Sequence, residues 1–279
     1  MSRLERMPPK KHLGQHFLKD TGVLSRIVRA IGPRAEDVFL EIGAGDGALS
    51  MRLAPRIAHL LAVEIDSDCL PKLRQSLAPF ENTTVVHGDM LELDPGELLQ
   101  PHLAPGTVPR VAGNLPYNQA TAIIESLIEA RFRFEDMTFL LQLEMAERIS
   151  ARAGSRIYGY FSVYCQHQCR TRLGFRVAPA CFTPRPGVIS ALITLQPRAI
   201  QRDPAFEAAF KELAKAAFAH RRKTLANSLR LHPRIGRITP ELLRLSEIDG
   251  SRRAEQLSVA EFEHLTRCSL ALQPAGGCC

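Results

Sequence analysis

The chain lacks several features that would assign it to membrane, secreted or metal-dependent proteins. It has no run of 18 apolar residues, which a membrane-spanning helix requires, and no apolar segment near the N-terminus that would direct secretion. Its seven cysteines are an odd number and lie scattered along the chain, which favours a reducing compartment over a disulfide framework. Metal-ligating residue types do not cluster at the spacings of a metal site. We therefore expect a cytoplasmic protein without a membrane segment or a bound metal.

What the chain does have is ample apolar sequence and an uneven distribution of charge. Its 279 residues are 45% hydrophobic, which suits one large domain, or one large domain with a small second one. The net charge is +7, but residues 1–19 and 199–279 each carry +4 and the remainder carries −1. Basic ends of this kind favour contact with phosphate groups. The alternative is the solvated surface of a soluble protein.

Strand and helix patterns alternate from Val38 to Gln196, which predicts an α/β fold with a mostly parallel, doubly wound sheet. Seven strands are expected, at residues 38–42, 60–64, 84–87, 109–113, 137–142, 172–177 and 190–196. Helices are expected at residues 22–31, 47–54, 68–77, 119–130, 144–152 and 159–168. Only residues 178–189, with three prolines, join the last two strands, and this link is too short for a crossover helix. These two strands are therefore expected to form an antiparallel hairpin at one edge of the sheet.

Beyond Pro197 the pattern becomes wholly helical. Apolar residues recur there at helical spacing, namely Phe206, Phe210, Leu213, Ala217 and Phe218. The sequence thus predicts two domains: residues 1–198 carry the sheet, and residues 199–279 form a small all-helical domain that ends in a frayed tail.

Residues suited to a nucleoside follow the first three expected strands. Gly43 and Gly45 come directly after the first strand and before a helix, so the backbone can approach a ligand closely there. Glu64 ends the second strand, where a carboxylate can bind both ribose hydroxyls. Asp89 follows the third strand, where an acid can accept a hydrogen bond from the amino group of an adenine. Open α/β sheets bind their ligands at this edge.

The same glycines raise a competing interpretation, because Gly43, Gly45 and Ala48 satisfy the G-x-G-x-x-A pattern of dinucleotide-binding dehydrogenases. Glu41 argues against a dehydrogenase, since a carboxylate before the glycines suits a positively charged amino-acid tail better than a pyrophosphate. The acid at Asp89 and a polar turn after the fourth strand argue against it as well. Together the strand ends indicate a site for S-adenosylmethionine that faces an amino group on a base.

That polar turn is Asn114-Leu115-Pro116-Tyr117. An amide oxygen and the carbonyl of Leu115 or Pro116 can accept both hydrogens of an exocyclic amino group, which draws the nitrogen lone pair out of conjugation. Tyr117 can stack on the base that carries the amino group. Taken alone, the tetrapeptide is also an ordinary turn between a strand and a helix. The neighbouring strand ends favour the interpretation as a site.

The chain resembles the ribosomal RNA adenine N6,N6-dimethyltransferases, which modify two neighbouring adenines near the 3′ end of small-subunit rRNA. The resemblance runs from near Lys11 to near Phe262 and rests on residues 13–18, 41–47, 64–66, 88–89, 113–118, 158–159, 182–186 and 221–229. The first and last of these motifs are specific to the family, whereas the glycine loop is common to most methyltransferases.

The resemblance implies an S-adenosylmethionine-dependent enzyme with a class I methyltransferase fold. Its partner would be small-subunit rRNA in a pre-ribosomal particle, and we expect the enzyme to be a monomer. Asn114 would touch both the cofactor and the target. The cofactor would also be bound by Gln15, His16, Leu18, Gly43, Glu64 and Asp89. For the His16 side chain, hydrogen bonding is favoured over a role as general base.

Further residues are expected to contact the RNA. The resemblance favours a role for Phe182 in stacking on a flipped adenine, on the face opposite Tyr117, over a role as a core anchor for the edge hairpin. A basic run on a helical stretch is expected to face phosphate rather than only solvent, namely Arg221, Arg222 and Lys223. Lys10 and Lys11 are expected to guide the RNA and the segment that closes over the cofactor.

The chain departs from the usual family pattern at Leu143, where a lysine is common, and at Gly187 and Ile189, where a lysine and an aspartate are common. These departures affect the expected grip on RNA and leave the methyl-transfer residues intact. Two alternative functions stay open: a large-subunit rRNA methylase of the macrolide-resistance type, and an rRNA-binding assembly factor with secondary or lost methylation.

Overall fold

The computed structural model describes residues 15–130, 132–198 and 203–272. The chain divides into two compact units, of which unit 1 comprises Met1–Ala146 and Arg172–Pro197. Unit 2 comprises Glu147–Thr171 and Arg198–Cys279. Within the described ranges, no helix is both long enough and apolar enough to cross a membrane.

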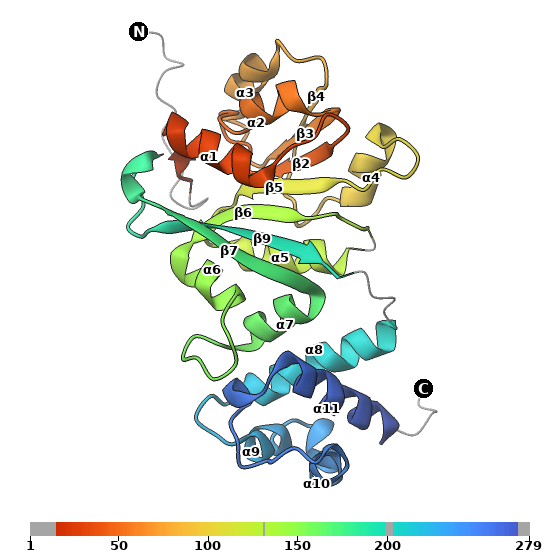
Figure 1. The fold of residues 1–279 in the computed structure, drawn as a ribbon. Coiled ribbons are helices and arrows are strands. Elements are labelled where there is room, and N and C mark those ends of the chain that lie inside the picture. Colours follow the sequence, from red (N-terminus) through yellow and green to blue (C-terminus); the bar gives the residue numbers. More distant parts are fainter. Residues whose placement is uncertain (1–14, 131, 199–202, 273–279) are drawn as a thin grey trace. The chain divides into compact units, whose positions relative to one another are not determined.

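A seven-stranded sheet forms the centre of unit 1, as the alternating pattern predicts (Figure 1). Its strands are β2 (Val38–Ile42), β3 (His59–Glu64), β4 (Thr83–His87), β5 (Arg110–Asn114), β6 (Met137–Gln142), β7 (Cys169–Val177) and β9 (Ser190–Pro197). They lie in the order β4-β3-β2-β5-β6-β9-β7. The pairs from β4 to β6 are parallel, and β9 runs antiparallel to β6. The expected fold class, with β7 and β9 neighbouring each other at one edge, is therefore confirmed.

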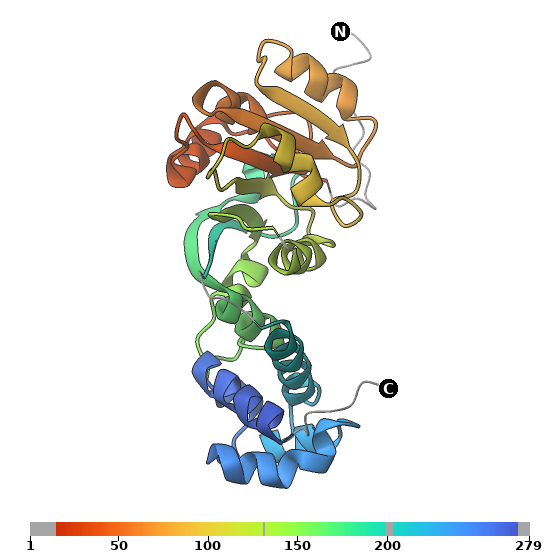
Figure 2. The same cartoon turned by 90° about the vertical axis from the view of Figure 1, so that its right-hand side faces the viewer.

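Helices cover both faces of this sheet, and α1 and α5 lie on opposite sides of it in Figure 2. The helices of unit 1 are α1 (Thr21–Ile31), α2 (Ser50–Leu53), α3 (Leu70–Leu77), α4 (Pro95–Leu99) and α5 (Ala120–Glu129), while α6 (Leu143–Ile149) crosses into unit 2. Short 3-10 turns occur at η3 (Ala54–Arg56), η4 (Gln100–His102) and η5 (Pro179–Cys181).

The first helix illustrates how local sequence sets an element. The Asp20 side chain accepts a hydrogen bond from the Val23 amide and caps the start of α1, and Gly32 ends the helix with φ +61. Its buried face packs into the core beside β2, with Leu24, Ile27, Val28 and Ile31. The helix expected from residue 47 begins only at Ser50, because Gly47 has φ +87 and cannot start a right-handed helix there.

A second, two-stranded sheet was not expected from the sequence. β1 (Phe17–Leu18) pairs antiparallel with β8 (Phe182–Thr183), which lies inside the link between β7 and β9. Two-residue strands leave no periodic pattern, and their pairing joins segments far apart along the chain. This small sheet attaches the start of the described chain to the edge hairpin.

Unit 2 is helical and includes residues that were expected to belong to the sheet domain. Its helices are α7 (Tyr160–Gln168), α8 (Pro204–Phe218), α9 (Leu225–Arg230), α10 (Ile235–Ser246) and α11 (Val259–Ala271), with a 3-10 turn, η6 (Ala254–Gln256). Helices α8 and α11 lie side by side (Figures 1 and 2). The contacts do not divide the chain at residue 198 alone. Tyr158 and Val163, which precede that position, share one core with Phe210 and Leu213.

Candidate functional site

The carboxyl ends of four parallel strands place the predicted ligand-binding residues in one row. The strand order β4-β3-β2-β5 puts Asp89, Glu64, Gly43 and Asn114 after or at the ends of consecutive neighbours. The Gly88 amide donates to the Glu64 carbonyl across 3.1 Å, so the ends of β4 and β3 are joined directly. This is the edge at which parallel α/β sheets bind ligands.

Glycine is required at two points of this edge. Gly43 has φ +70, and a Cβ added there would lie 3.3 Å from the Asn114 carbonyl oxygen. At Gly113 an added Cβ would lie 2.4 Å from the Ile42 carbonyl oxygen, which is backbone and cannot turn aside. The close approach of β2 and β5 therefore depends on the absence of side chains here.

Glu64 holds the glycine loop in place. One carboxylate oxygen accepts from the Gly45 amide at 2.7 Å and the other accepts from the Asp66 amide at 2.8 Å. Burial raises the pKa of Glu64, and these backbone hydrogen bonds partly oppose that rise. Each carboxylate oxygen retains acceptor capacity, so the group can also accept from ligand hydroxyls.

Glu64 and Asn114 open into the same cavity, as the interpretation of the strand ends requires. Its empty volume is about 500 Å³, and it is lined on one side by Gln15, His16 and Phe17 and elsewhere by Gly43, Gly45, Glu64, Ile65, Asn114, Leu115, Pro116 and Tyr117. The cavity thus brings together most of the residues predicted to bind a cofactor with all of the polar turn.

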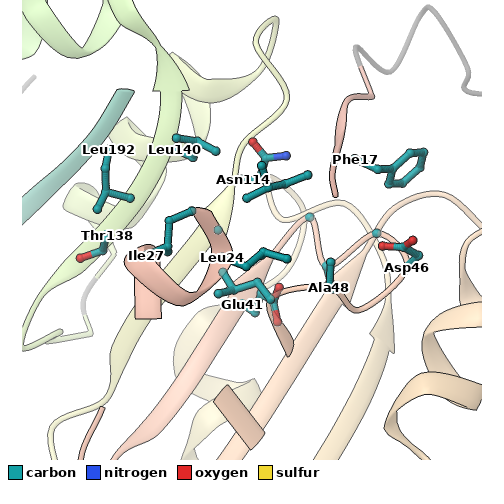
Figure 3. A pocket seen from close by; sticks show the side chains of 16 residues that line it. Phe17, Leu24, Ile27, Glu41, Asp46, Ala48, Asn114, Thr138, Leu140 and Leu192 are labelled. Carbon is teal, nitrogen blue, oxygen red and sulfur yellow. The ribbon is translucent and has the colours of Figure 1, made fainter. Parts of the chain in front are cut away.

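An adjoining pocket shares Phe17, Gly43, Gly45 and Asn114 with this cavity and extends toward α1 and β9 (Figure 3). The Glu41 carboxyl lies in its lining and is buried. Among the described residues, Glu41 Oε2 has no hydrogen-bond partner. Burial, together with the nearby charges of Glu64 and Asp46, raises the pKa of Glu41 to about 8.

Two sets of hydrogen bonds hold the Asn114–Tyr117 turn. The Pro116 carbonyl already accepts from the amides of Gln119 and Ala120, at 3.1 and 3.0 Å, at the start of α5. Of the two carbonyls considered for the target amino group, that of Leu115 is therefore the better acceptor. The Tyr117 hydroxyl is 2.8 Å from the Ser190 hydroxyl, and burial raises the pKa of Tyr117. Ser190 was missed by the sequence analysis, since no motif marked it.

Residues 15–19, here called the lid segment, lie against the cavity. The Gln15 side-chain amide donates to the Asp66 carboxylate at 2.8 Å, and the Lys19 ammonium pairs with the Asp46 carboxylate. Gln15 and His16 line the cavity, whereas Leu18 lines the adjoining pocket and packs into the core. The three residues predicted to close over the cofactor thus line two different compartments, and their closing role stays a prediction.

Asp89 and Phe182 line neither compartment. Asp89 lies one strand beyond Glu64, and one of its oxygens accepts from the Leu91 amide at 2.9 Å. Phe182 is 4% exposed and shares a buried core with Leu18, its partner in β1. This is the position that the alternative role as a core anchor predicts. Stacking on a base would require this ring to leave its core position, so its catalytic role stays a prediction.

The predicted RNA contacts come from two stretches of the chain, residues 10–11 and 221–223. Lys10 and Lys11 fall outside the described residues. Arg221, Arg222 and Lys223 are exposed, but they occupy a turn before α9 rather than a helix. The helix begins only at Leu225 because the Thr224 hydroxyl caps it by accepting from the Asn227 amide.

The departures from the family pattern meet in space. The Leu143 amide donates to the Ile189 carbonyl at 2.9 Å, and Ile189 directly precedes Ser190, the partner of Tyr117. Val188 and Ile189 are exposed, and Gly187 has no neighbour within 4 Å of an added Cβ. Leu143 and Ile189, which are 46 residues apart in the sequence, are thus hydrogen-bonded neighbours beside Ser190.

The residues present fit a cofactor that carries positive charge and a nucleoside. Three carboxyl groups, those of Glu41, Asp46 and Glu64, lie around the glycine loop, and one of them has an unpartnered buried oxygen. Within the described chain, no group of three or more metal-ligating side chains is present.

Comparisons with known proteins agree with this geometry. The family model described as ribosomal RNA adenine dimethylase matches residues 8–268. The chain is 39% identical to the ribosomal RNA small subunit methyltransferase A of Ligilactobacillus salivarius, over 92% of this chain and 88% of the relative. It is 40% identical to the protein of the same name from Pseudomonas fluorescens strain Pf-5, over 95% of each chain.

Two solved structures share the fold. A dimethyladenosine transferase from Plasmodium falciparum gives a TM-score of 0.75 at 22% identity, over 90% of this chain and 96% of that one. The 23S rRNA methyltransferase ErmE gives a TM-score of 0.68 at 25% identity, over 90% of this chain and 98% of that one.

Proposed function

Because the chain belongs to the ribosomal RNA adenine dimethylase family, a family of S-adenosylmethionine-dependent methyltransferases, we propose that it methylates N6 of adenines in small-subunit rRNA. Two methyl groups are added to each base, on two adjacent adenines near the 3′ end. The observation that carries the proposal is the single cavity shared by Glu64 and Asn114, where a nucleoside cofactor and an amino group can meet.

The cofactor is held by residues of four segments. Glu64 accepts from the ribose hydroxyls, Asp89 accepts from the adenine amino group, and Gly43 and Gly45 allow close approach of the backbone. The lid segment closes this site through Gln15, His16 and Leu18. S-adenosylmethionine, when bound, supplies a methyl group carried by a sulfonium. The leaving group is then a neutral thioether, so no general acid is needed.

The protein acts on the target mainly by orientation. Asn114 Oδ1 and the Leu115 carbonyl accept the two N6 hydrogens of the target adenine, so the nitrogen lone pair is directed at the methyl group. Pro116 shapes the turn, and Tyr117 stacks on the base. We propose that Phe182 stacks on the other face when the RNA is bound. The proton on N6 leaves to solvent after transfer.

The partner we propose is small-subunit rRNA within a pre-ribosomal particle in the cytoplasm, bound by a monomer of this chain during ribosome biogenesis. The exposed Arg221, Arg222 and Lys223 are positioned in a turn, where all three cations are accessible to phosphate. Lys10 and Lys11 would add to this contact. The identity to small-subunit methyltransferases, 39–40%, exceeds the 25% to the 23S enzyme, which favours the small subunit.

The proposal is tested by mapping the methyl groups. Purified protein with tritiated S-adenosylmethionine is expected to label immature small subunits, with two methyl groups on each modified adenine. Label confined to large-subunit RNA would instead favour the 23S type of activity. If no RNA accepts label, the proposal is wrong, and silence in calorimetry at high cofactor concentration would favour the assembly factor.

Replacing Glu41 by Gln is expected to remove a pH dependence of stability. The pKa of Glu41 rises from 4.5 to about 8 on folding because the carboxyl is buried. The folded protein therefore binds more protons than the unfolded chain between these values, and stability falls as the pH rises through that range. Urea unfolding between about pH 5 and about pH 9 should show this decline in the wild type and a flatter profile in Glu41→Gln. Equal slopes would show that Glu41 ionises normally.

A further inference from the structure

His16 lies where three separate segments of the site meet. Its backbone carbonyl accepts from Asn114 Nδ2 at 2.8 Å. Its ring Nδ1 is 2.9 Å from the Pro184 carbonyl oxygen. The centroid of the same ring is 5.4 Å from that of Tyr117. One residue of the lid segment thus contacts the polar turn and the residue that follows β8.

The contact with Asn114 determines which way its amide points. A carboxamide has one accepting oxygen and one donating nitrogen, and a backbone carbonyl can only accept. The Asn114 nitrogen must therefore face the His16 carbonyl, and the Asn114 oxygen must point away from it. In the opposite orientation two donors, the Asn114 NH₂ and the N6 amino group of a target, would face each other. We propose that His16 is a positioning residue that fixes the Asn114 amide in its accepting orientation.

The ring contact holds the carbonyl of His16 in place. Since the Pro184 carbonyl can only accept, Nδ1 must carry the hydrogen. The adjoining pairs Phe17–Thr183 and Leu18–Phe182 tie the same two segments together along the backbone. The His16 side chain therefore extends the β1–β8 sheet by one contact, directly beside the carbonyl that binds Asn114.

This inference rests on the proposed function and deepens it. The Asn114 oxygen points at the target amino group only while the lid segment lies against the cavity. His16 therefore takes part both in closing the lid segment over the cofactor and in aligning the target base. A lid segment that has moved away from the cavity leaves the Asn114 amide free to rotate, and the base then loses its alignment. His16 acts through Asn114, not as a base.

The test compares two substitutions of one side chain. His16→Ala removes the donor to Pro184, whereas His16→Asn keeps one, because Asn Nδ2 is bonded to Cγ as His Nδ1 is. We expect His16→Ala to lower the single-turnover methyl-transfer rate on the order of tenfold, the effect of one lost hydrogen bond. His16→Asn should restore most of the rate. The rate is measured with cofactor in excess, so that a change in cofactor affinity, which calorimetry reports separately, does not account for the loss, and thermal unfolding reports on folding.

A third variant tests the amide itself. Asn114→Asp keeps an accepting oxygen but has no hydrogen to give the His16 carbonyl, so the inference expects a loss of rate. Retained activity in Asn114→Asp would overturn it, as would equal rates in His16→Ala and His16→Asn. His102→Ala and His102→Asn serve as matched controls, because His102 stacks on His59 at the start of β3, the opposite end of that strand from Glu64. If the wild type labels no RNA in the same assay, the proposed function fails instead.

Discussion

Asn114→Ala should lower the single-turnover rate of methyl transfer by about a hundredfold or more, the usual effect of removing one preorganised polar contact from a reacting group. The substitution removes Oδ1, which accepts one N6 hydrogen, and leaves the Leu115 carbonyl as the remaining one of the two proposed acceptors. It also removes the donor to the His16 carbonyl, so the lid segment loses a contact of 2.8 Å. Both losses act on the alignment of the target nitrogen.

The measurement is the rate of label transfer to immature small subunits with cofactor in excess. Calorimetry should show that the variant still binds S-adenosylmethionine, because Gly43, Glu64 and Asp89 are unchanged. Asn118→Ala, at an exposed position of the same turn, controls for general disturbance of the backbone. A rate for Asn114→Ala within about tenfold of the wild type would remove Asn114 from the catalytic residues.

Arg110→Ala should reduce the free energy of unfolding by about 3 kcal/mol, because it takes from the buried Asp37 one of its two guanidinium partners and removes the hydrogen bonds to Asp136. The Arg110 side chain is 6% exposed and pairs with Asp37 at 2.7 Å and Asp136 at 2.8 Å. It also donates to the carbonyls of Ile31 and Gly32, which end α1. One side chain thus joins β5 to the C-terminus of the helix that covers the sheet.

Urea denaturation monitored by circular dichroism measures this loss, and Arg34→Ala is the matched control. Arg34 binds the same Asp37, but its side chain is 46% exposed, so its removal should cost about 1 kcal/mol or less. Equal effects of the two substitutions would show that burial does not distinguish these ion pairs.

The same network predicts an acid sensitivity with a definite sign. Burial alone would raise the pKa of Asp37, but hydrogen bonds from Arg34 and Arg110 outweigh it and hold the pKa below its ordinary value. The pairing therefore stabilises the fold above the ordinary aspartate pKa, about 3.9, and the stabilisation is lost as the pH falls through the lower folded value. Arg110→Ala should weaken this acid-induced loss.

Much of the fold was predictable because its signals are local. The strands from Val38 to Gln142 are short segments rich in apolar and β-branched residues, and glycines follow β2, so the order of elements and the expected binding edge follow from sequence alone. Glu64, Asp89 and Asn114 could be placed at that edge from the sequence because parallel strands bring their carboxyl ends together. The family resemblance supplied the chemistry for that edge.

Other features depend on contacts between distant residues, and only the tertiary structure determined them. The Asn114 amide is oriented by a carbonyl 98 residues away, and the His16 ring meets Pro184 across 168 residues. Phe182 occupies the core, and residues 147–171 pack with the C-terminal helices, because burial is settled by neighbours that no local pattern names. Periodicity along the chain reports which face of an element is apolar, but a side chain's partner is decided by packing in three dimensions.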